Sequence, residues 1–246
     1  MRLRPGVMFA TALAACALTG PTRAEPVRCG PFAYERLPPP VPSPYPSAVE
    51  RANSITRAVK SSRHSILFFG DSLTEGWDAA VWQQSLAPRG VLNAGVSGDR
   101  TDHLLWRLQN GNLAGPPPDA VVLLLGTNDL AYGRSPELTA DGIRANLREL
   151  RQYFPDANIL LLGLLPREKS PTARLRLATI AVNRLIRGCA DGQQIVYADI
   201  GDVLLDGDGR LTAAISPDAL HLSTRGYSLL AARLTPELHR LLGPRQ

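Results

Sequence analysis

Five short stretches of this chain are apolar at consecutive positions. Successive residues of a β-strand point to opposite faces of the sheet, so a continuously apolar strand is buried on both faces. This pattern is typical of a parallel sheet that is covered by helices on both sides, and not of a sheet with one face in water. We therefore expect buried strands at Ile66–Phe69, Val91–Asn93, Ala120–Leu125, Ile159–Leu162 and Ile195–Ala198.

The segments that separate and follow these strands are amphipathic, with apolar residues recurring every three or four positions as on one face of a helix. One such stripe consists of Leu138, Ile143, Leu147, Leu150 and Phe154, and another of Leu230, Leu234, Leu238 and Leu241. The predicted helices are Asp78–Gln84, Thr101–Asn110, Pro136–Phe154, Ala173–Gly188 and Thr224–Leu242. A capping-box pattern at Ser47 and Glu50 predicts a further helix that runs to about Lys60. The alternation predicts an α/β fold, a three-layer α/β/α sandwich with a mainly parallel sheet.

The first 24 residues have the pattern of a signal peptide. Met1–Arg4 is basic, Val7–Leu18 is apolar, and Thr22-Arg23-Ala24 is a suitable cleavage site. The apolar stretch is shorter than the roughly 20 residues that a membrane-spanning helix needs. We expect residues 1–24 to be removed and the protein to be exported, periplasmic or secreted. The alternative is a lipoprotein anchored through Cys16, because Leu13-Ala14-Ala15-Cys16 is similar to a lipobox.

A proline-rich arm, residues 25–46, precedes a single predicted domain at residues 47–246. Its segment Leu37–Pro46 contains six prolines in ten residues and is interpreted as an extended, semi-rigid tether. In an oxidising compartment Cys29 and Cys189 could form a disulfide that joins the arm to the domain, or remain unpaired. The sequence leaves that choice open.

Charge gives no reason to expect a nucleic-acid partner. The formal net charge of the 246-residue chain is +5, and removal of residues 1–24, which hold three arginines and no acid, lowers it to +2. Motifs for nucleotide, zinc and redox chemistry are absent from the sequence, so no metal or other cofactor is expected. Asp206-Gly207-Asp208-Gly209 lacks the later glutamate of a calcium-binding EF-hand loop and is interpreted as a tight turn. The sequence does not predict the oligomeric state.

Candidate chemistry begins at Gly70-Asp71-Ser72-Leu73, which follows the first predicted strand directly. Far downstream, Asp218 precedes His221 by three residues. A serine, a histidine that takes and returns its proton, and a carboxylate that orients the histidine together convert an alcohol into an acyl-transfer nucleophile. We therefore predict a catalytic triad of Ser72, His221 and Asp218.

Acyl transfer also requires hydrogen-bond donors for the oxyanion of the tetrahedral intermediate. The candidates are the backbone N–H groups of Ser72 and Gly98 and the side-chain amide of Asn128. Ser72, Gly98 and Asn128 follow the first, second and third predicted strands, and in α/β folds ligands bind beyond the carboxyl ends of the strands. We expect the three segments to converge at one edge of the sheet.

Other serines and histidines are weaker candidates. Ser97 lacks the Gly-x-Ser-x-Gly spacing of a nucleophile elbow. His64 precedes a strand, and His103 and His239 lie inside predicted helices without an obvious orienting acid. All three are interpreted as surface or packing residues.

The motifs resemble those of the SGNH (GDSL-type) hydrolases. Gly70-Asp71-Ser72-Leu73, Gly98, Gly126-Thr127-Asn128-Asp129 and Asp218-x-x-His221 are similar to four ordered sequence blocks of that family. The stretches 93–101, 103–111 and 162–167 are similar to the catalytic subunits of platelet-activating-factor acetylhydrolase. The resemblance implies an SGNH, flavodoxin-like fold, the triad Ser72, Asp218 and His221, and the oxyanion hole Ser72, Gly98 and Asn128. It also favours short acyl groups, acetyl above all.

Together these observations predict an exported serine esterase that works through an acyl-enzyme on short-chain, acetyl-type esters. An O-acetylated glycan is the expected substrate for an exported enzyme of this kind, and a lysophospholipid or thioester is the alternative. A different class of protein, a non-catalytic module that binds a glycan or a partner at the same edge, would be indicated by loss of a triad residue. No triad residue is lost.

Overall fold

A computed structural model describes residue 29 and residues 34–242 of the chain. Its five strands form one sheet in the order β2-β1-β3-β4-β5, and every neighbouring pair is parallel. The strands are β1 (Ile66–Gly70), β2 (Val91–Gly95), β3 (Ala120–Leu124), β4 (Asn158–Leu162) and β5 (Ile195–Ala198). The predicted α/β/α fold class is confirmed, and each predicted strand agrees with an observed one to within two residues at either end.

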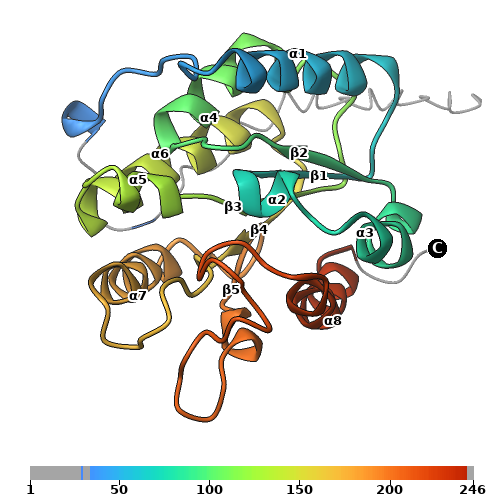
Figure 1. The fold of residues 1–246 in the computed structure, drawn as a ribbon. Coiled ribbons are helices and arrows are strands. Elements are labelled where there is room, and N and C mark those ends of the chain that lie inside the picture. The colour runs from blue at the N-terminus through green and yellow to red at the C-terminus, as the bar shows by residue number, and fades with distance from the viewer. Residues whose placement is uncertain (1–28, 30–33, 243–246) are drawn as a thin grey trace, which may run out of the picture.

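The helices cover both faces of this sheet (Figure 1). They are α1 (Pro46–Ser61), α2 (Ser72–Glu75), α3 (Ala79–Ser85), α4 (Thr101–Arg107), α5 (Thr127–Ala131), α6 (Pro136–Tyr153), α7 (Arg174–Arg187) and α8 (Thr224–Leu242). Short 3-10 turns lie at Tyr34–Arg36, Ala87–Arg89 and Gly201–Leu204. The five helices predicted from amphipathic patterns and the helix predicted from the capping-box pattern are present, whereas the short helices α2 and α5 were not assigned from the sequence.

Two hydrophobic cores, one on each face of the sheet, explain the continuously apolar strands. In β1, Leu67 and Phe69 join the core that includes residues of α1, α4, α6 and α7. Their neighbours Ile66 and Phe68 join the other core, with residues of α3 and α8. Burial of apolar surface on both faces therefore selects an uninterrupted apolar strand.

Two helix boundaries differ from the sequence-based expectation. The capping box at Ser47 and Glu50 is not formed, because the helix already begins at Pro46 and its N-cap is Tyr45. Proline suits that first position, where a backbone N–H would have no helical partner. The helix α4 ends at Arg107, three residues early, and the chain continues through a π-type turn, Leu108–Asn112, in which Gly111 has a φ of 122°.

The N-terminal arm is joined to the domain by a disulfide between Cys29 and Cys189, a pairing that the sequence left open. The predicted signal peptide, including Cys16, lies outside the described residues. Within the described part of the chain, no helix is long and apolar enough to cross a membrane. The segment from Asp206 to Gly209 forms a tight turn, in which the Asp206 carboxylate accepts hydrogen bonds from the N–H groups of Asp208 and Arg210.

The direction in which strands are added to the sheet reverses at β1. The chain leaves β1 toward β2 on one side, while β3 and β4 continue the sheet on the other side of β1. In open parallel sheets a ligand binds beyond the carboxyl ends of the strands at such a switch in direction. Ser72 follows β1 and Asn128 follows β3, so both lie at the carboxyl ends of adjacent strands beside this switch.

Candidate active site

The loop after β1 brings Ser72 close to the end of the sheet. Asp71 is the N-cap of α2, and its side chain accepts a hydrogen bond from the N–H of Leu73 at 2.9 Å. The turn fits only because residue 70 is glycine: a Cβ there would lie 2.6 Å from the carbonyl oxygen of Leu124. Ser72 is therefore the first residue of α2, directly beyond the end of β1.

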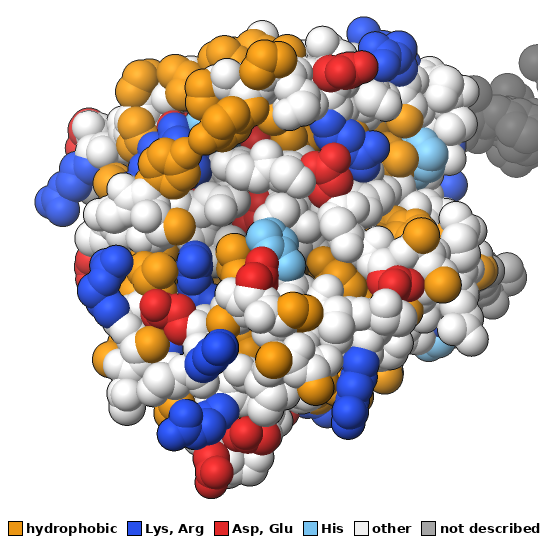
Figure 2. Space-filling model, in the orientation of Figure 1, with side chains coloured by type: hydrophobic (Ala, Val, Ile, Leu, Met, Phe, Trp, Pro, Cys, Tyr) orange, Lys and Arg blue, Asp and Glu red, His pale blue; other side chains and the backbone are white. Residues whose placement is uncertain are grey.

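Two hydrogen bonds connect the three residues predicted as a triad. Ser72 Oγ lies 2.9 Å from Nε2 of His221, although the two residues are 149 positions apart in the sequence. Nδ1 of His221 lies 2.7 Å from Oδ2 of Asp218. Histidine and acidic side chains lie together at the surface in the middle of the face shown in Figure 2. This geometry can transfer a proton from the serine to the imidazole and back.

The Asp218 carboxylate is bound by its own loop as well as by the imidazole. Its Oδ1 accepts hydrogen bonds from the N–H groups of Leu220, at 3.0 Å, and His221, at 2.7 Å. Desolvation raises the pKa of Asp218, but the hydrogen bonds from the side chain and backbone of His221 outweigh it and leave the pKa below its ordinary value. Asp218 is therefore ionised in the pH range in which esterases work and can stabilise an imidazolium.

The other two predicted oxyanion donors follow the neighbouring strands: Gly98 lies on the loop after β2, and Asn128 lies in the first turn of α5, after β3. Gly98 has a φ of 79°, a left-handed conformation that favours glycine. Asn128 donates one amide hydrogen to the carbonyl oxygen of Asp99, at 2.9 Å. A primary amide carries two hydrogens, so this bond orients the amide and leaves the second hydrogen for an oxyanion.

A hydrogen bond between the segment of Glu168 and the loop that carries His221, which we call the clasp, was not predicted from the sequence. Glu168 donates its N–H to the carbonyl oxygen of Ala219 at 2.8 Å, and both residues have left-handed backbones, with φ of 60° and 61°. The buried guanidinium of Arg176 donates to the carbonyl oxygens of Arg167, Glu168 and Gly209, which holds the segment of Glu168 in place. Because Ala219 lies between Asp218 and His221, the clasp supports the loop that carries both.

The half-buried Arg134 links the segments that follow β2 and β3, a second feature that the sequence did not reveal. Arg134 pairs with Asp129 at 2.7 Å and with Asp102 at 2.9 Å, while the Asp129 carboxylate accepts bonds from the N–H and hydroxyl of Thr101. These contacts connect the loop that carries Asn128 to the start of α4. Asp129 and Arg134 are five residues apart, whereas Thr101 and Asp102 are about 30 residues away from them, so nothing in the sequence indicated that the four residues meet.

Asp71 is fully buried, and this desolvation raises its pKa to about 7, with further increases from the charges of Asp99 and Asp129. The unfolded carboxyl releases its proton near pH 3.9. Between about pH 4 and 7 the folded state therefore binds more protons than the unfolded state, and a rise in pH destabilises the wild-type protein.

We expect Asp71→Asn, which mimics the protonated carboxyl, to gain stability relative to wild type as the pH rises from about 4 to 7. The gain should approach about 1.4 kcal/mol for each pH unit. Urea unfolding of both proteins at several pH values measures it. A difference in the free energy of unfolding that does not change with pH would contradict a raised pKa at Asp71.

The remaining histidines and Ser97 do not take part in the hydrogen bonds that connect Ser72, His221 and Asp218. Burial of His103 lowers its pKa to about 4, and the charge of Arg100 lowers it further. The carboxylate of Asp99, which the sequence did not indicate as a neighbour of this histidine, lies 4.0 Å from Nδ1. His64 bonds to Ser62, and the exposed His239 bonds to Arg89. Ser97 is exposed, and its N–H donates to the Glu75 carboxylate. His103 is thus a neutral packing residue at neutral pH.

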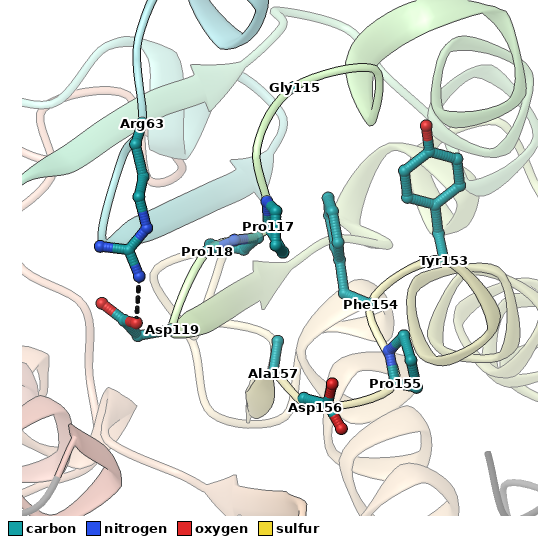
Figure 3. A pocket seen from close by; sticks show the side chains of 10 residues that line it. All are labelled: Arg63, Gly115, Pro117, Pro118, Asp119, Tyr153, Phe154, Pro155, Asp156 and Ala157. Carbon is teal, nitrogen blue, oxygen red and sulfur yellow. Dashed lines mark hydrogen bonds and ion pairs between the residues drawn. The ribbon is translucent and has the colours of Figure 1, made fainter. Parts of the chain in front are cut away.

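A cavity of about 490 Å³ lies at the opposite edge of the sheet, where β3 and β4 begin (Figure 3). Its lining includes Pro117, Phe154 and the ion pair of Arg63 with Asp119. Figure 3 shows Tyr153 at one end of this cavity. Among the described residues, no group of histidine, cysteine and acidic side chains is arranged to hold a metal ion.

Comparison with known proteins relates this arrangement to a family. Residues 68–229 match the GDSL-like Lipase/Acylhydrolase family. Platelet-activating factor acetylhydrolase IB subunit alpha1 of Homo sapiens is 34% identical over 189 residues, which cover 76% of this chain and 80% of that protein. Subunit alpha2 of the corresponding enzyme of Gallus gallus is 33% identical over 194 residues, covering 77% and 81% of the two chains.

Solved structures share the fold. A structure from Streptococcus pneumonia with a platelet-activating-factor assignment has a TM-score of 0.69 at 26% identity and covers 78% of this chain and 92% of its own. A mutant acetyl-xylooligosaccharide esterase from Geobacillus has a TM-score of 0.57 at 21% identity and covers 75% and 96%. At that identity the second likeness concerns the fold alone.

Proposed function

The chain belongs to the GDSL-like lipase/acylhydrolase family and is a carboxylic ester hydrolase, and on that premise we propose that it cleaves short-chain, acetyl-type esters through an acyl-enzyme on Ser72. The observation that supports this most directly is the chain of two hydrogen bonds from Ser72 through His221 to Asp218. The names of the curated relatives, which are acetylhydrolases, support the preference for acetyl groups.

In the first half of the proposed reaction, Ser72 Oγ attacks the ester carbonyl carbon while its proton passes to Nε2 of His221. The carbonyl oxygen becomes an oxyanion that is stabilised by the N–H groups of Ser72 and Gly98 and by the Asn128 amide. Each such donor contributes about 2.7–4 kcal/mol to transition-state stabilisation in enzymes of this kind. His221 then gives its proton to the leaving alcohol oxygen, the C–O bond breaks, and the acyl group stays on Ser72.

In the second half, water attacks the acyl-enzyme carbonyl, and His221 accepts the proton of that water. Collapse of the second tetrahedral intermediate breaks the bond to Ser72 Oγ, which recovers a proton from His221, and the carboxylic acid leaves. Asp218 fixes the tautomer in which Nδ1 carries hydrogen, so that Nε2 can act as the base. All the groups that this cycle needs belong to the chain itself.

The rate of hydrolysis as a function of acyl length tests the acetyl preference. We expect kcat/KM of the purified protein for p-nitrophenyl esters to be highest for acetate and to fall for butyrate and octanoate. Lysophospholipids and acyl thioesters are assayed alongside. A maximum for octanoate or for lysophospholipid would favour the lipid-hydrolase alternative, and a lack of activity on every ester would contradict the proposed function.

We further propose that the protein is exported and that its natural substrates are O-acetylated glycans. The leader pattern of residues 1–24 supports export, and polysaccharides are common ester-bearing polymers outside the cytoplasm. The mass of the N-terminal peptide of the protein recovered from the producing cell distinguishes cleavage after Ala24 from acylation at Cys16. A retained Met1 would contradict both forms of export.

A further inference from the structure

Two exposed tyrosines stand beside the proposed oxyanion hole. Tyr45 is 48% exposed and Tyr132 is 59% exposed, and their hydroxyl groups are 3.0 Å apart. Tyr45 is the N-cap of α1 at the end of the proline-rich arm, whereas Tyr132 follows α5. Two distant segments therefore present one aromatic surface, which we call the tyrosine pair.

The tyrosine pair adjoins the loops that carry Gly98 and Asn128. The ring of Tyr45 lies 3.8 Å from the position that a Cβ on Gly98 would occupy. The N–H of Tyr132 donates to the carbonyl oxygen of Asn128 at 2.9 Å. Figure 2 shows hydrophobic side chains gathered along the upper left of this face, where Figure 1 places the arm and α5. The arm, interpreted from the sequence as a tether, thus contributes a side chain to the border of the site.

Both rings are held in place although they are exposed. The Arg100 guanidinium lies 4.7 Å from the centroid of the Tyr132 ring, within the range of a cation–π contact. Arg100 is itself fixed by Asp102, at 3.3 Å. Through the bond between the two hydroxyl groups, Tyr132 in turn restrains Tyr45. A preorganised aromatic surface binds a ligand with little loss of side-chain entropy.

We propose that the tyrosine pair binds the sugar ring of the alcohol half of an acetyl ester. This inference rests on the proposed function, in which the acyl half is acetyl and is too small to extend beyond the oxyanion hole. Both members of the tyrosine pair are large, exposed side chains next to this hole: the ring of Tyr45 approaches Gly98, and the backbone N–H of Tyr132 is bonded to Asn128.

The chemistry of the surface matches that of a pyranose. A sugar ring has a face of C–H groups, which packs against an aromatic face, and a rim of hydroxyl groups. Tyrosine offers an apolar ring together with a polar tip, and Arg100, which lies over the Tyr132 ring, adds a charged donor. An alkyl chain could use the rings but would leave the hydroxyl and guanidinium groups without new partners, so a glycan ester fits the surface better than a lipid.

The test compares two acetyl esters with alcohol halves of different size. Full-length wild type, Tyr45→Ala and Tyr132→Ala are assayed on an acetylated xylo-oligosaccharide and on ethyl acetate, whose ethyl group is too short to stack on the rings. We expect the ratio of kcat/KM for the oligosaccharide to that for ethyl acetate to fall about tenfold in each variant, an effect of about 1.4 kcal/mol. The fall should come mainly from a higher KM, and Tyr132→Phe, which keeps the ring, should retain most of the ratio.

Tyr153→Ala is the matched control, because Tyr153 is similarly exposed but lies at the opposite edge of the sheet. It should leave the ratio unchanged. An equal loss on both esters in the alanine variants, or a loss that appears only on a lysophosphatidylcholine, would overturn the sugar subsite. Wild type that cleaves ethyl acetate but not the oligosaccharide would overturn the subsite alone, whereas wild type without activity on any ester would refute the proposed function itself.

Discussion

Ser72→Ala should lower kcat/KM for p-nitrophenyl acetate by a factor of about 10⁴ or more, because the acyl-enzyme can no longer form. The hydroxyl that disappears is the one that lies 2.9 Å from Nε2 of His221. The variant should keep the folded state of the wild type, since alanine is well tolerated at the start of a helix. Steady-state kinetics with equal amounts of folded protein measure the loss.

Ser97→Ala is the control for this experiment. Like Ser72, Ser97 closely follows a strand, β2, and it is exposed. Its known contact is made by the backbone N–H, which the substitution retains. It should hydrolyse p-nitrophenyl acetate at nearly the wild-type rate. If Ser72→Ala is as active as wild type, or if Ser97→Ala is the inactive variant, the nucleophile has been assigned wrongly.

Arg107→Met should lower the free energy of unfolding by about 3–5 kcal/mol, the usual cost of removing one partner of a buried ion pair. Arg107 is buried and donates to the Asp99 carboxylate at 2.6 Å, to Asn112 at 2.7 Å, and to the carbonyl oxygens of Ala94 at 2.9 Å and Gly70 at 3.2 Å. The variant leaves all four acceptors without this donor. Chemical denaturation at neutral pH measures the change.

The protonation state of Asp99 determines how much stability Arg107→Met loses. Desolvation raises the pKa of Asp99 to about 6 even though Arg107 counteracts it, so the carboxylate is charged at neutral pH and needs its partner. Activity should fall as well, because Gly70 and Ala94 lie at the ends of the two strands that lead to Ser72 and Gly98.

Arg63→Met provides the comparison, because Arg63 and Asp119 form an ion pair whose side chains are 56% and 47% exposed. An exposed pair of this kind contributes about 0–1 kcal/mol. If the Arg107 and Arg63 variants lose equal amounts of stability, the network around Asp99 does not hold the strand ends together as described.

Local patterns were sufficient to locate the regular elements. The apolar runs placed the five strands, and in β1 and β3, which are buried throughout, burial on both faces leaves no polar position. Helix boundaries were predicted less accurately than strand positions, because they depend on local contacts that compete. At the start of α1, Pro46 suits the first helical turn better than Ser47 suits the N-cap, and the helix begins one residue before the predicted cap.

Local patterns also explain which residues of the candidate site could be predicted from the sequence. Ser72, Gly98 and Asn128 follow the ends of predicted strands, and parallel strands bring their carboxyl ends to one edge. His103 was interpreted as a surface or packing residue, but the nearby Asp99 was not foreseen as its neighbour. The arm residue Tyr45 was interpreted as part of a tether, because nothing near it in sequence indicates Tyr132 as its partner.

The amino-acid sequence by itself determined the class of fold, the order of the strands and helices along the chain, and the short list of side chains with the right chemistry. Only the tertiary structure decided the strand order within the sheet, the pairing of Cys29 with Cys189, the clasp at Ala219 and the contact between Tyr45 and Tyr132. The physical reason is the range of the interactions. Periodic burial and turn geometry are set by neighbouring residues and can be seen in the sequence, whereas hydrogen bonds and ring contacts between segments about a hundred residues apart depend on how the whole chain packs.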